Sequence, residues 1–198
     1  NSLDPSTLCE VGCGAGEILN QLSLGNADTQ FFGYEISPQA FSLCEKKSND
    51  KLSFFLKDPL QDDDEFFDIV MAIDVFEHVE DYLGFLRKLK ERGEYKIFHI
   101  PLDLSVQTVL RSSPILRRRK SVGHIHYFTK ETALATLQDT GYEVLDYFYT
   151  ASILGLHNRG SGSWKTKLLS LPRRVSYFLN EHLAVRILGG WSLLVLAR

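Results

Sequence analysis

The first two thirds of the chain alternate short apolar runs with segments of helical periodicity. Residues 67–73 are apolar at nearly every position, as expected for a central strand that is buried on both faces. Residues 79–90 instead place apolar side chains three and four positions apart, which predicts a helix with one buried face. This alternation indicates an α/β fold, with a parallel sheet covered by helices on both faces.

The same pattern predicts the individual elements. Strands are expected at residues 7–11, 30–36, 52–56, 67–73, 95–100, 142–149 and 191–197. Helices are expected at residues 17–24, 39–47, 79–90 and 129–140. The last helix begins at Thr129, a residue type that caps helices, and stops at Gly141, which readily adopts the left-handed conformation found after helix ends.

The last two predicted strands are separated by about 40 residues, far more than the usual connection. We therefore expect one domain over residues 1–198, with a helical insertion at about 151–189 before the last strand. Within it, residues 164–187 mix leucines with basic side chains, and Pro172 divides them into two expected helices. Such helices can cover the active site or the core, form a homodimer contact, or make a peripheral membrane contact.

Composition narrows the class of protein. Apolar residues make up 44% and charged residues 24% of the 198 residues, typical of a packed globular domain. No apolar run reaches the roughly 18 residues that a membrane-spanning helix needs, and no signal peptide pattern is seen. Cys9, Cys13 and Cys44 are too few and too irregularly spaced for a disulfide framework or a zinc site. Reduced thiols in a cytoplasmic protein are expected.

Charge is divided unevenly along the chain. The first hundred residues hold 19 acidic and 9 basic side chains, whereas the remaining 98 hold 6 acidic and 13 basic ones. A nucleic-acid partner is not expected, because a nucleic-acid binder usually shows one dominant basic face. The basic excess in the second half favours an anionic substrate, partner or surface there. Residues 117–120, the densest basic run, are expected to form a solvated loop or to contact an anionic group of the substrate.

The strongest functional signal lies in residues 8–16, where an apolar strand ends in an acidic residue and three glycines follow at alternate positions. Glycines let the backbone turn sharply and let a ligand approach without meeting a Cβ atom. The following helix offers unpaired N–H groups, so a nucleotide-like ligand is predicted at this edge of the sheet. Glu17 occupies a position where a dinucleotide fingerprint needs a small residue, which disfavours NAD and FAD.

Glu10, Gly12, Gly14 and Gly16 match the motif E/D-x-G-x-G-x-G, and the chain resembles the class I S-adenosylmethionine-dependent methyltransferases. The resemblance continues in order along the chain. It includes Glu35 at the end of the second strand, Lys57-Asp58-Pro59 after the third, Asp74-Val75-Phe76-Glu77-His78-Val79 after the fourth, and residues 123–129 and 140–144 on the approach to the sixth.

The segment after the fourth strand is similar to the small-molecule branch that includes quinone-pathway enzymes. The resemblance covers about residues 7–150 and the closing strand. It implies a Rossmann-like, mostly parallel seven-stranded sheet of order 3-2-1-4-5-7-6.

The resemblance also implies a site for S-adenosylmethionine, with S-adenosylhomocysteine as its product. In the family, the acidic residue at the end of the second strand accepts hydrogen bonds from both ribose hydroxyls, and an Asp after the third strand meets the adenine amino group. These roles fall to Glu35 and Asp58, while Glu10 is expected to fix the loop or to meet the ammonium group of the cofactor. The residues expected at the cofactor are Glu10, Gly12, Cys13, Gly14, Gly16, Glu35, Ile36, Asp58, Pro59, Ile73, Asp74, Val75 and His78.

His124 and His126 are the candidate catalytic residues. Their alternate spacing in an extended segment puts both on one face, and a histidine can deprotonate a substrate near neutral pH. Two histidines without a third ligand do not make a metal site, so no metal is expected. His78 is expected to face the cofactor or to cap a helix that starts at Val79, and His99 is expected to be structural. The acidic residues 62–65 are expected to form a solvated loop.

Together these features predict methyl transfer to a small-molecule acceptor, with oxygen as a candidate acceptor atom. Two alternatives stay open: a protein or RNA methyltransferase, and a catalytically silent cofactor-binding module that serves as a partner subunit. Enzymes that methylate amino groups of nucleic acids usually carry an Asn/Asp-Pro-Pro-aromatic run where this chain has Asp-Val-Phe-Glu at 74–77. Residues 102–127 and the insertion are expected to set acceptor specificity.

Overall fold

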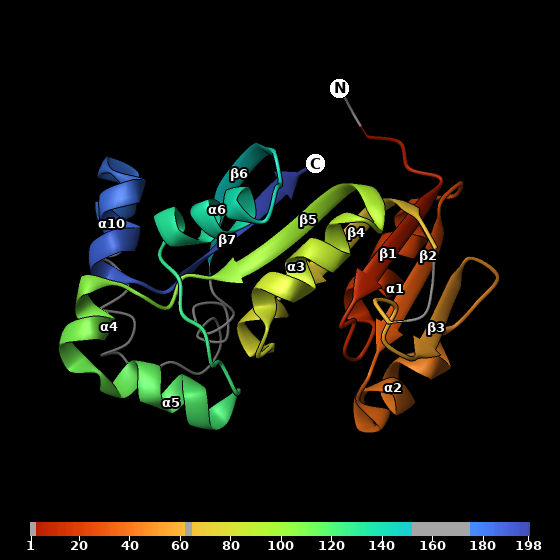
Figure 1. Ribbon diagram of the computed structural model, residues 1–198, viewed down its shortest axis with the longest axis horizontal. Coiled ribbons are helices and arrows are strands. Elements are labelled where there is room, and N and C mark those ends of the chain that lie inside the picture. The colour runs from red at the N-terminus through yellow and green to blue at the C-terminus, as the bar shows by residue number, and fades with distance from the viewer. Residues whose placement is uncertain (1–2, 62–64, 152–174) are drawn as a thin grey trace.

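The computed structural model describes residues 3–61, 65–151 and 175–198, in which seven strands form one sheet (Figure 1). Their order is β3-β2-β1-β4-β5-β7-β6, as predicted. The first five strands are parallel, and β7 runs antiparallel to both of its neighbours, β5 and β6. The strands are β1 (Thr7–Val11), β2 (Gln30–Glu35), β3 (Leu52–Leu56), β4 (Phe67–Ile73), β5 (Gly93–Pro101), β6 (Val144–Ala151) and β7 (Trp191–Ala197).

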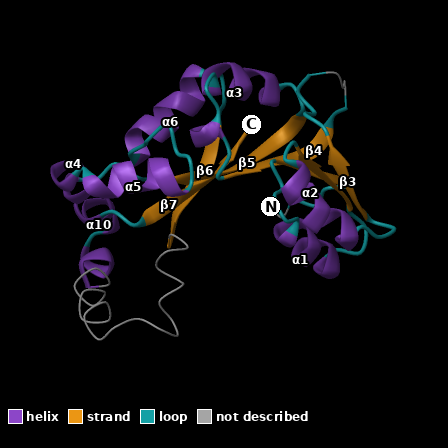
Figure 2. Cartoon of the chain, turned by 90° about the horizontal axis from the view of Figure 1, so that it is seen from below, coloured by secondary structure: helices purple, strands orange, loops and turns teal. Residues whose placement is uncertain are grey.

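Helices cover the sheet from both sides (Figure 2). The helices are α1 (Glu17–Gly25), α2 (Pro38–Cys44), α3 (Tyr82–Lys90), α4 (Val106–Arg111), α5 (Ser113–Ser121), α6 (Lys130–Asp139) and α10 (Glu181–Leu188), with short 3₁₀ turns η1 (Glu45–Lys47) and η2 (Phe76–His78). Leu19 of α1 and Cys44 of α2 are buried in one apolar core, whereas Leu86 of α3 and Leu137 of α6 belong to a second core on the opposite face. The predicted two-sided architecture is confirmed.

The start of α3 differs from the prediction. The helix begins at Tyr82 rather than at Val79, because η2 interrupts the chain before it. Asp81 caps the helix by accepting a hydrogen bond from the Gly84 amide at 2.9 Å. The predicted capping role of His78 is therefore wrong.

The segment between β5 and β6 also differs from the prediction, since residues 117–120 lie in a helix and not in a loop. Ser105 and Thr108 cap α4 reciprocally, and α5 follows with Pro114 in its first turn. Proline is well tolerated there because the first amides of a helix have no partner within it.

Only part of the predicted insertion lies within the described residues, because 152–174, including Pro172, fall outside them. Of the described part, α10 buries Ala184 and Val185, while Phe178 and Leu179 before it are exposed. The suggested homodimer or membrane contact through residues 164–187 stays a prediction. Among the described residues, every helix is too short or too polar to cross a bilayer. All three cysteines are buried free thiols.

Candidate functional site

The loop between β1 and α1 turns at three glycines. Gly12, Gly14 and Gly16 have φ angles of 73°, 55° and 71°, a left-handed region that residues with a Cβ atom rarely adopt. The amides of Gly12 and Cys13 both donate to the carbonyl of Tyr34, at 2.8 and 3.0 Å. The loop is therefore held by backbone hydrogen bonds to β2, its neighbour in the sheet.

The three glycines serve different purposes. A Cβ at Gly12 would lie 2.9 Å from Cγ2 of Val75, and one at Gly16 would lie 2.6 Å from the Phe54 ring, so both positions are needed for packing inside the protein. A Cβ at Gly14 would meet no atom within 4 Å. Gly14 thus presents bare backbone to open space at the carboxyl edge of the sheet, where open α/β sheets bind their ligands.

Glu35, at the end of β2, is buried and its carboxylate is aimed at this loop. Oε2 accepts a hydrogen bond from the Gly14 amide at 2.8 Å, and Oε1 accepts from the amides of Ile36 and Ser37 at 2.9 and 2.8 Å. A carboxylate can accept about four hydrogen bonds, so the group has capacity for one more donor in this arrangement. The Ile36 side chain beside it is 72% exposed and offers an apolar surface.

Glu10, at the end of β1, is only 2% exposed. Its Oε2 atom has no hydrogen-bond partner among the residues that the structure describes. Burial raises the pKa of Glu10 to about 8. A buried carboxylate oxygen without a donor is costly, and a ligand that supplies a positive charge or an N–H group to it would relieve that cost.

Asp58 follows β3, at the place where the resemblance puts the contact with adenine. Its Oδ1 atom accepts from the Leu60 amide at 2.9 Å, and its Oδ2 atom accepts from Nε2 of Gln61 at 3.0 Å. The carboxylate thus stabilises the turn after β3, and Pro59 in that turn is buried. The adenine contact stays a prediction.

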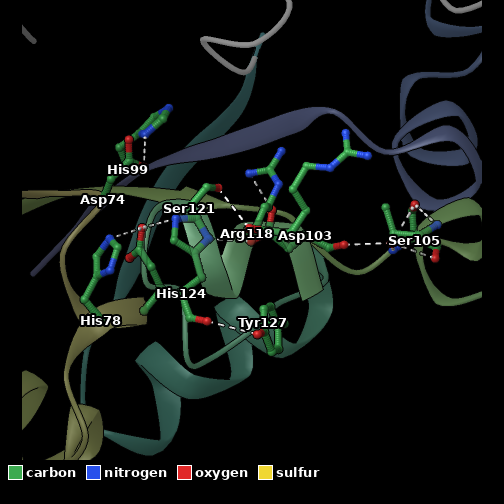
Figure 3. Close-up of polar contacts among 12 residues, drawn as sticks. Asp74, His78, His99, Asp103, Ser105, Arg118, Ser121, His124 and Tyr127 are labelled. Atoms are coloured by element: carbon green, nitrogen blue, oxygen red, sulfur yellow. Dashed lines mark hydrogen bonds and ion pairs between the residues drawn. The ribbon is translucent and has the colours of Figure 1, made fainter. Parts of the chain in front are cut away.

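The residues after β4 connect the glycine loop to the neighbouring strands at the carboxyl edge of the sheet. Val75 packs against Gly12, while Asp74 holds a positive φ of 53°, which is unfavourable for a residue other than glycine. The strain is held by hydrogen bonds, because Asp74 Oδ1 lies 2.7 Å from Nδ1 of His99, whose Nε2 lies 2.8 Å from Oγ1 of Thr150 (Figure 3). His99 is thus part of a polar link between β4, β5 and β6.

Five polar side chains from η2, α5 and the loops around them form a second group, which we call the Glu77 cluster (Figure 3). Its members are Glu77, His78, Asp103, Arg118 and His124, and Figure 3 labels the last four of them. His124 Nδ1 lies 2.6 Å from Oδ2 of Asp103, and the other oxygen of Asp103 pairs with Arg118 at 2.7 Å.

Glu77 is fully buried within its cluster, and burial raises its pKa to about 8. Its Oε1 atom lies 3.9 Å from Nε2 of His78 and 4.0 Å from Nε2 of His124. These distances are too long for hydrogen bonds. Burial also lowers the pKa of His78.

The two histidines proposed as catalytic have different partners. His124 belongs to the Glu77 cluster, whereas Nε2 of His126 lies 2.9 Å from the carbonyl oxygen of Val79 and its ring packs on Tyr82, with centroids 4.4 Å apart. Because the two rings have separate partners, they do not act as a pair. His124 is therefore the better candidate for a catalytic residue.

Sequence reasoning assigned no role to Glu77 or Asp103. A signal for Glu77 was present, because it lies next to His78 in the motif after β4. Asp103 lies two residues after β5. Its pairing with Arg118 and His124 depends on how α5 lies relative to the end of β5, and no local sequence pattern predicts that arrangement.

A sequence model for a family described as "Methyltransferase domain" matches residues 2–147. The chain belongs to this family. The methyltransferase also shares its fold with solved structures. Magnesium protoporphyrin IX methyltransferase from Synechocystis with bound S-adenosylhomocysteine matches with a TM-score of 0.62 and 16% identity, over 96% of this chain and 72% of that one. The N-methyltransferase NodS from Bradyrhizobium japonicum, also with S-adenosylhomocysteine, matches with a TM-score of 0.59 and 15% identity, over 98% of this chain and 78% of that one. A complex of a Haloferax volcanii methyltransferase with the activator Trm112 matches with a TM-score of 0.67 and 17% identity, over 99% of this chain and 82% of that one.

Identities this low establish the fold of the methyltransferase and nothing finer. Together, the family match and the fold confirm the resemblance to class I S-adenosylmethionine-dependent methyltransferases that the sequence motifs indicate.

Proposed function

We propose that this methyltransferase binds S-adenosylmethionine at the glycine loop and transfers its methyl group to an oxygen of a small-molecule acceptor. The observation that carries the proposal is the Gly14–Glu35 contact, in which a glycine that faces open space is fixed by a buried carboxylate at the end of the neighbouring strand.

The residues at this edge fit the cofactor. The unpartnered Oε2 of Glu10 suits an ammonium group, and the remaining acceptor capacity of Glu35 suits a ribose hydroxyl. The exposed Ile36 suits the flat face of a base. When bound, S-adenosylmethionine supplies a methyl group on a positively charged sulfur, which is already a strong electrophile.

The main contribution of the protein is therefore to place the acceptor in line with the methyl group. Orientation of two reactants can lower a barrier by roughly 7–11 kcal/mol. The Glu77 cluster is well placed for the acceptor, because Val75, two residues before Glu77, packs against the glycine loop.

A proton must also leave a hydroxyl acceptor when its oxygen is methylated. Asp103 holds Nδ1 of His124, which fixes the orientation of the ring and leaves Nε2 as the candidate acceptor of that proton. General-base catalysis of this kind contributes about 10²- to 10⁴-fold to the rate. This arrangement supports oxygen as the acceptor atom.

Calorimetric titration with S-adenosylmethionine and S-adenosylhomocysteine tests cofactor binding. Release of S-adenosylhomocysteine then tests turnover with a panel of phenols, catechols, carboxylic acids, amines, peptides and RNA. We expect binding of both compounds and turnover with a hydroxyl compound. Binding without turnover on any acceptor would favour a silent partner subunit, and turnover confined to peptides or RNA would favour a macromolecular substrate.

A further inference from the structure

Three metal-binding side chains converge in the Glu77 cluster. Oε1 of Glu77 and the Nε2 atoms of His78 and His124 lie within 4.8 Å of one another. Ligand bonds of about 2.1 Å would place the ligand atoms of a tetrahedral site roughly 3.4 Å apart, so small side-chain rotations bring these atoms to coordinating distance. The rings of His78 and His124 have their centroids 4.9 Å apart. Figure 3 shows the two side chains next to each other.

Both histidines are already oriented as metal ligands. Nδ1 of His124 lies 2.6 Å from the carboxylate of Asp103, and Nδ1 of His78 lies 3.1 Å from the carbonyl oxygen of Gly123. Because a carbonyl or carboxylate oxygen only accepts, each Nδ1 is the donor in its contact, and an imidazole in that tautomer has its lone pair on Nε2. Metal-ligating histidines in proteins show this same outer contact.

Among the described residues, nothing donates a hydrogen bond to the Glu77 carboxylate that would explain its burial. Its side chain is fully buried, and neither carboxylate oxygen has a hydrogen-bond partner within the described ranges. The backbone does fix it, since its carbonyl accepts from the amides of Ile125 and His126 at 2.9 and 3.1 Å. That clamp joins η2 to the segment that carries His124. A buried, unpaired carboxylate aimed at two imidazole lone pairs is the arrangement that a cation would stabilise.

We propose that Glu77, His78 and His124 bind one divalent transition-metal ion, of which Zn²⁺ fits the donor set best. Two imidazoles and one carboxylate are a known ligand set for zinc, and three protein ligands leave a coordination position open. On the proposed function, that position receives an oxygen of the acceptor, so the site selects acceptors with an ionisable hydroxyl. A hydroxyl that binds the ion would give its proton to water, because Nε2 of His124 holds the ion and cannot take that proton. Asp103 orients His124 through its Nδ1 atom, and Arg118 pairs with Asp103.

The test is metal titration of the full chain, freed of any purification tag and stripped with a chelator. Calorimetry with Zn²⁺ measures affinity and stoichiometry, and Co²⁺ gives a visible absorption spectrum that reports the ligand geometry. We expect one ion per chain in the unmodified protein. Glu77→Gln and His124→Ala should each weaken binding by at least tenfold, and Asp103→Asn should weaken it by about 10- to 100-fold through the orientation of His124.

His182→Ala is the matched control, because His182 is half exposed and lies on α10, outside the cluster. It should bind the metal like the unmodified protein. Absence of a stoichiometric site, or equal affinity in the unmodified protein and both ligand variants, would overturn the proposal. Thermal unfolding of the same samples shows that each variant is folded. S-adenosylhomocysteine is titrated into them separately, and absence of that binding in the unmodified protein would count against the cofactor site and not against the metal site.

Discussion

The amide nitrogen of Gly14 lies 2.8 Å from Oε2 of Glu35, so the glycine loop after β1 is fastened to the end of β2 by one charge-assisted hydrogen bond. The two residues are 21 positions apart in sequence and meet because β1 and β2 are parallel neighbours. The same contact fixes the bare face of the loop and positions a carboxylate for a ligand hydroxyl.

Glu35→Ala removes both functions of this carboxylate. We expect it to weaken binding of S-adenosylhomocysteine by about 1–3 kcal/mol, the range for lost hydrogen bonds to a charged group. Calorimetry measures the change. Glu45→Ala, which removes an exposed carboxylate in η1, serves as the control and should bind normally. Equal affinities of the two variants for S-adenosylhomocysteine would show that Glu35 does not contribute to the cofactor site.

Glu10 predicts a pH dependence of stability in the absence of ligand. Its pKa is about 8 in the folded protein and about 4.5 as an ordinary carboxyl group. Between these values the folded state binds more protons than the unfolded state, so the free energy of unfolding falls as the pH rises from about 4.5 to about 8.

Urea unfolding from about pH 5 to about pH 8 measures this slope. Glu10→Gln should lose less stability over that range than the unmodified protein, by on the order of 1 kcal/mol or more, while binding S-adenosylhomocysteine more weakly. Glu45→Gln should keep the original slope. Parallel curves for all three proteins would contradict the account of Glu10 as a buried carboxyl.

The ion pair between Asp103 and Arg118 predicts a stability effect. Arg118→Ala leaves a carboxylate that is 4% exposed without its guanidinium partner. Because Arg118 itself is partly exposed, we expect a loss of about 2–4 kcal/mol in the free energy of unfolding, somewhat less than for a fully buried pair. Arg119→Ala, at the next and exposed position of α5, should change it by no more than about 0.5 kcal/mol. Similar losses of unfolding free energy in both variants would show that the Asp103–Arg118 ion pair does not stabilise the fold.

His124 predicts a split between turnover and cofactor binding. His124→Ala should reduce turnover by about 10²- to 10⁴-fold, because the ring acts on the acceptor whether as base or as metal ligand. Its affinity for S-adenosylhomocysteine should stay unchanged. His182→Ala should alter neither quantity. Full activity in His124→Ala, once an acceptor is known, would exclude the histidine from the mechanism.

The central strands were predictable because burial on both faces leaves a strong apolar signal, although the edge strand β6 exposes Leu145 and Phe148. The bounds of β1, β3, β4 and β7 agree with those expected from the sequence, whereas β6 starts at Val144, since Tyr142 turns into the core to donate to the Leu86 carbonyl. The glycine motif likewise predicted the turn between β1 and α1, whereas the cofactor contacts expected there stay a prediction. Local pattern was sufficient for both.

The helices α4 and α5 were missed for a physical reason. Both are short, and α5 is rich in arginine, so neither shows an apolar stripe of useful length. The capping box of α4 uses Thr108 where the usual motif has Glu or Gln. The Glu77 cluster depends on α5 and on the segment after it returning to η2, and such long-range contacts are not encoded in any one segment.

Calorimetric titration of S-adenosylhomocysteine into Gly14→Ala and Gly25→Ala tests the central claim most directly. A Cβ meets no protein atom within 4 Å at either glycine, so neither variant creates a clash inside the protein, although Ala at Gly14 bears the strain of a φ of 55°. We predict a loss of at least tenfold in affinity for Gly14→Ala and normal affinity for Gly25→Ala. Unchanged affinity in a folded Gly14→Ala protein would contradict the claim that the ligand lies against this face of the loop.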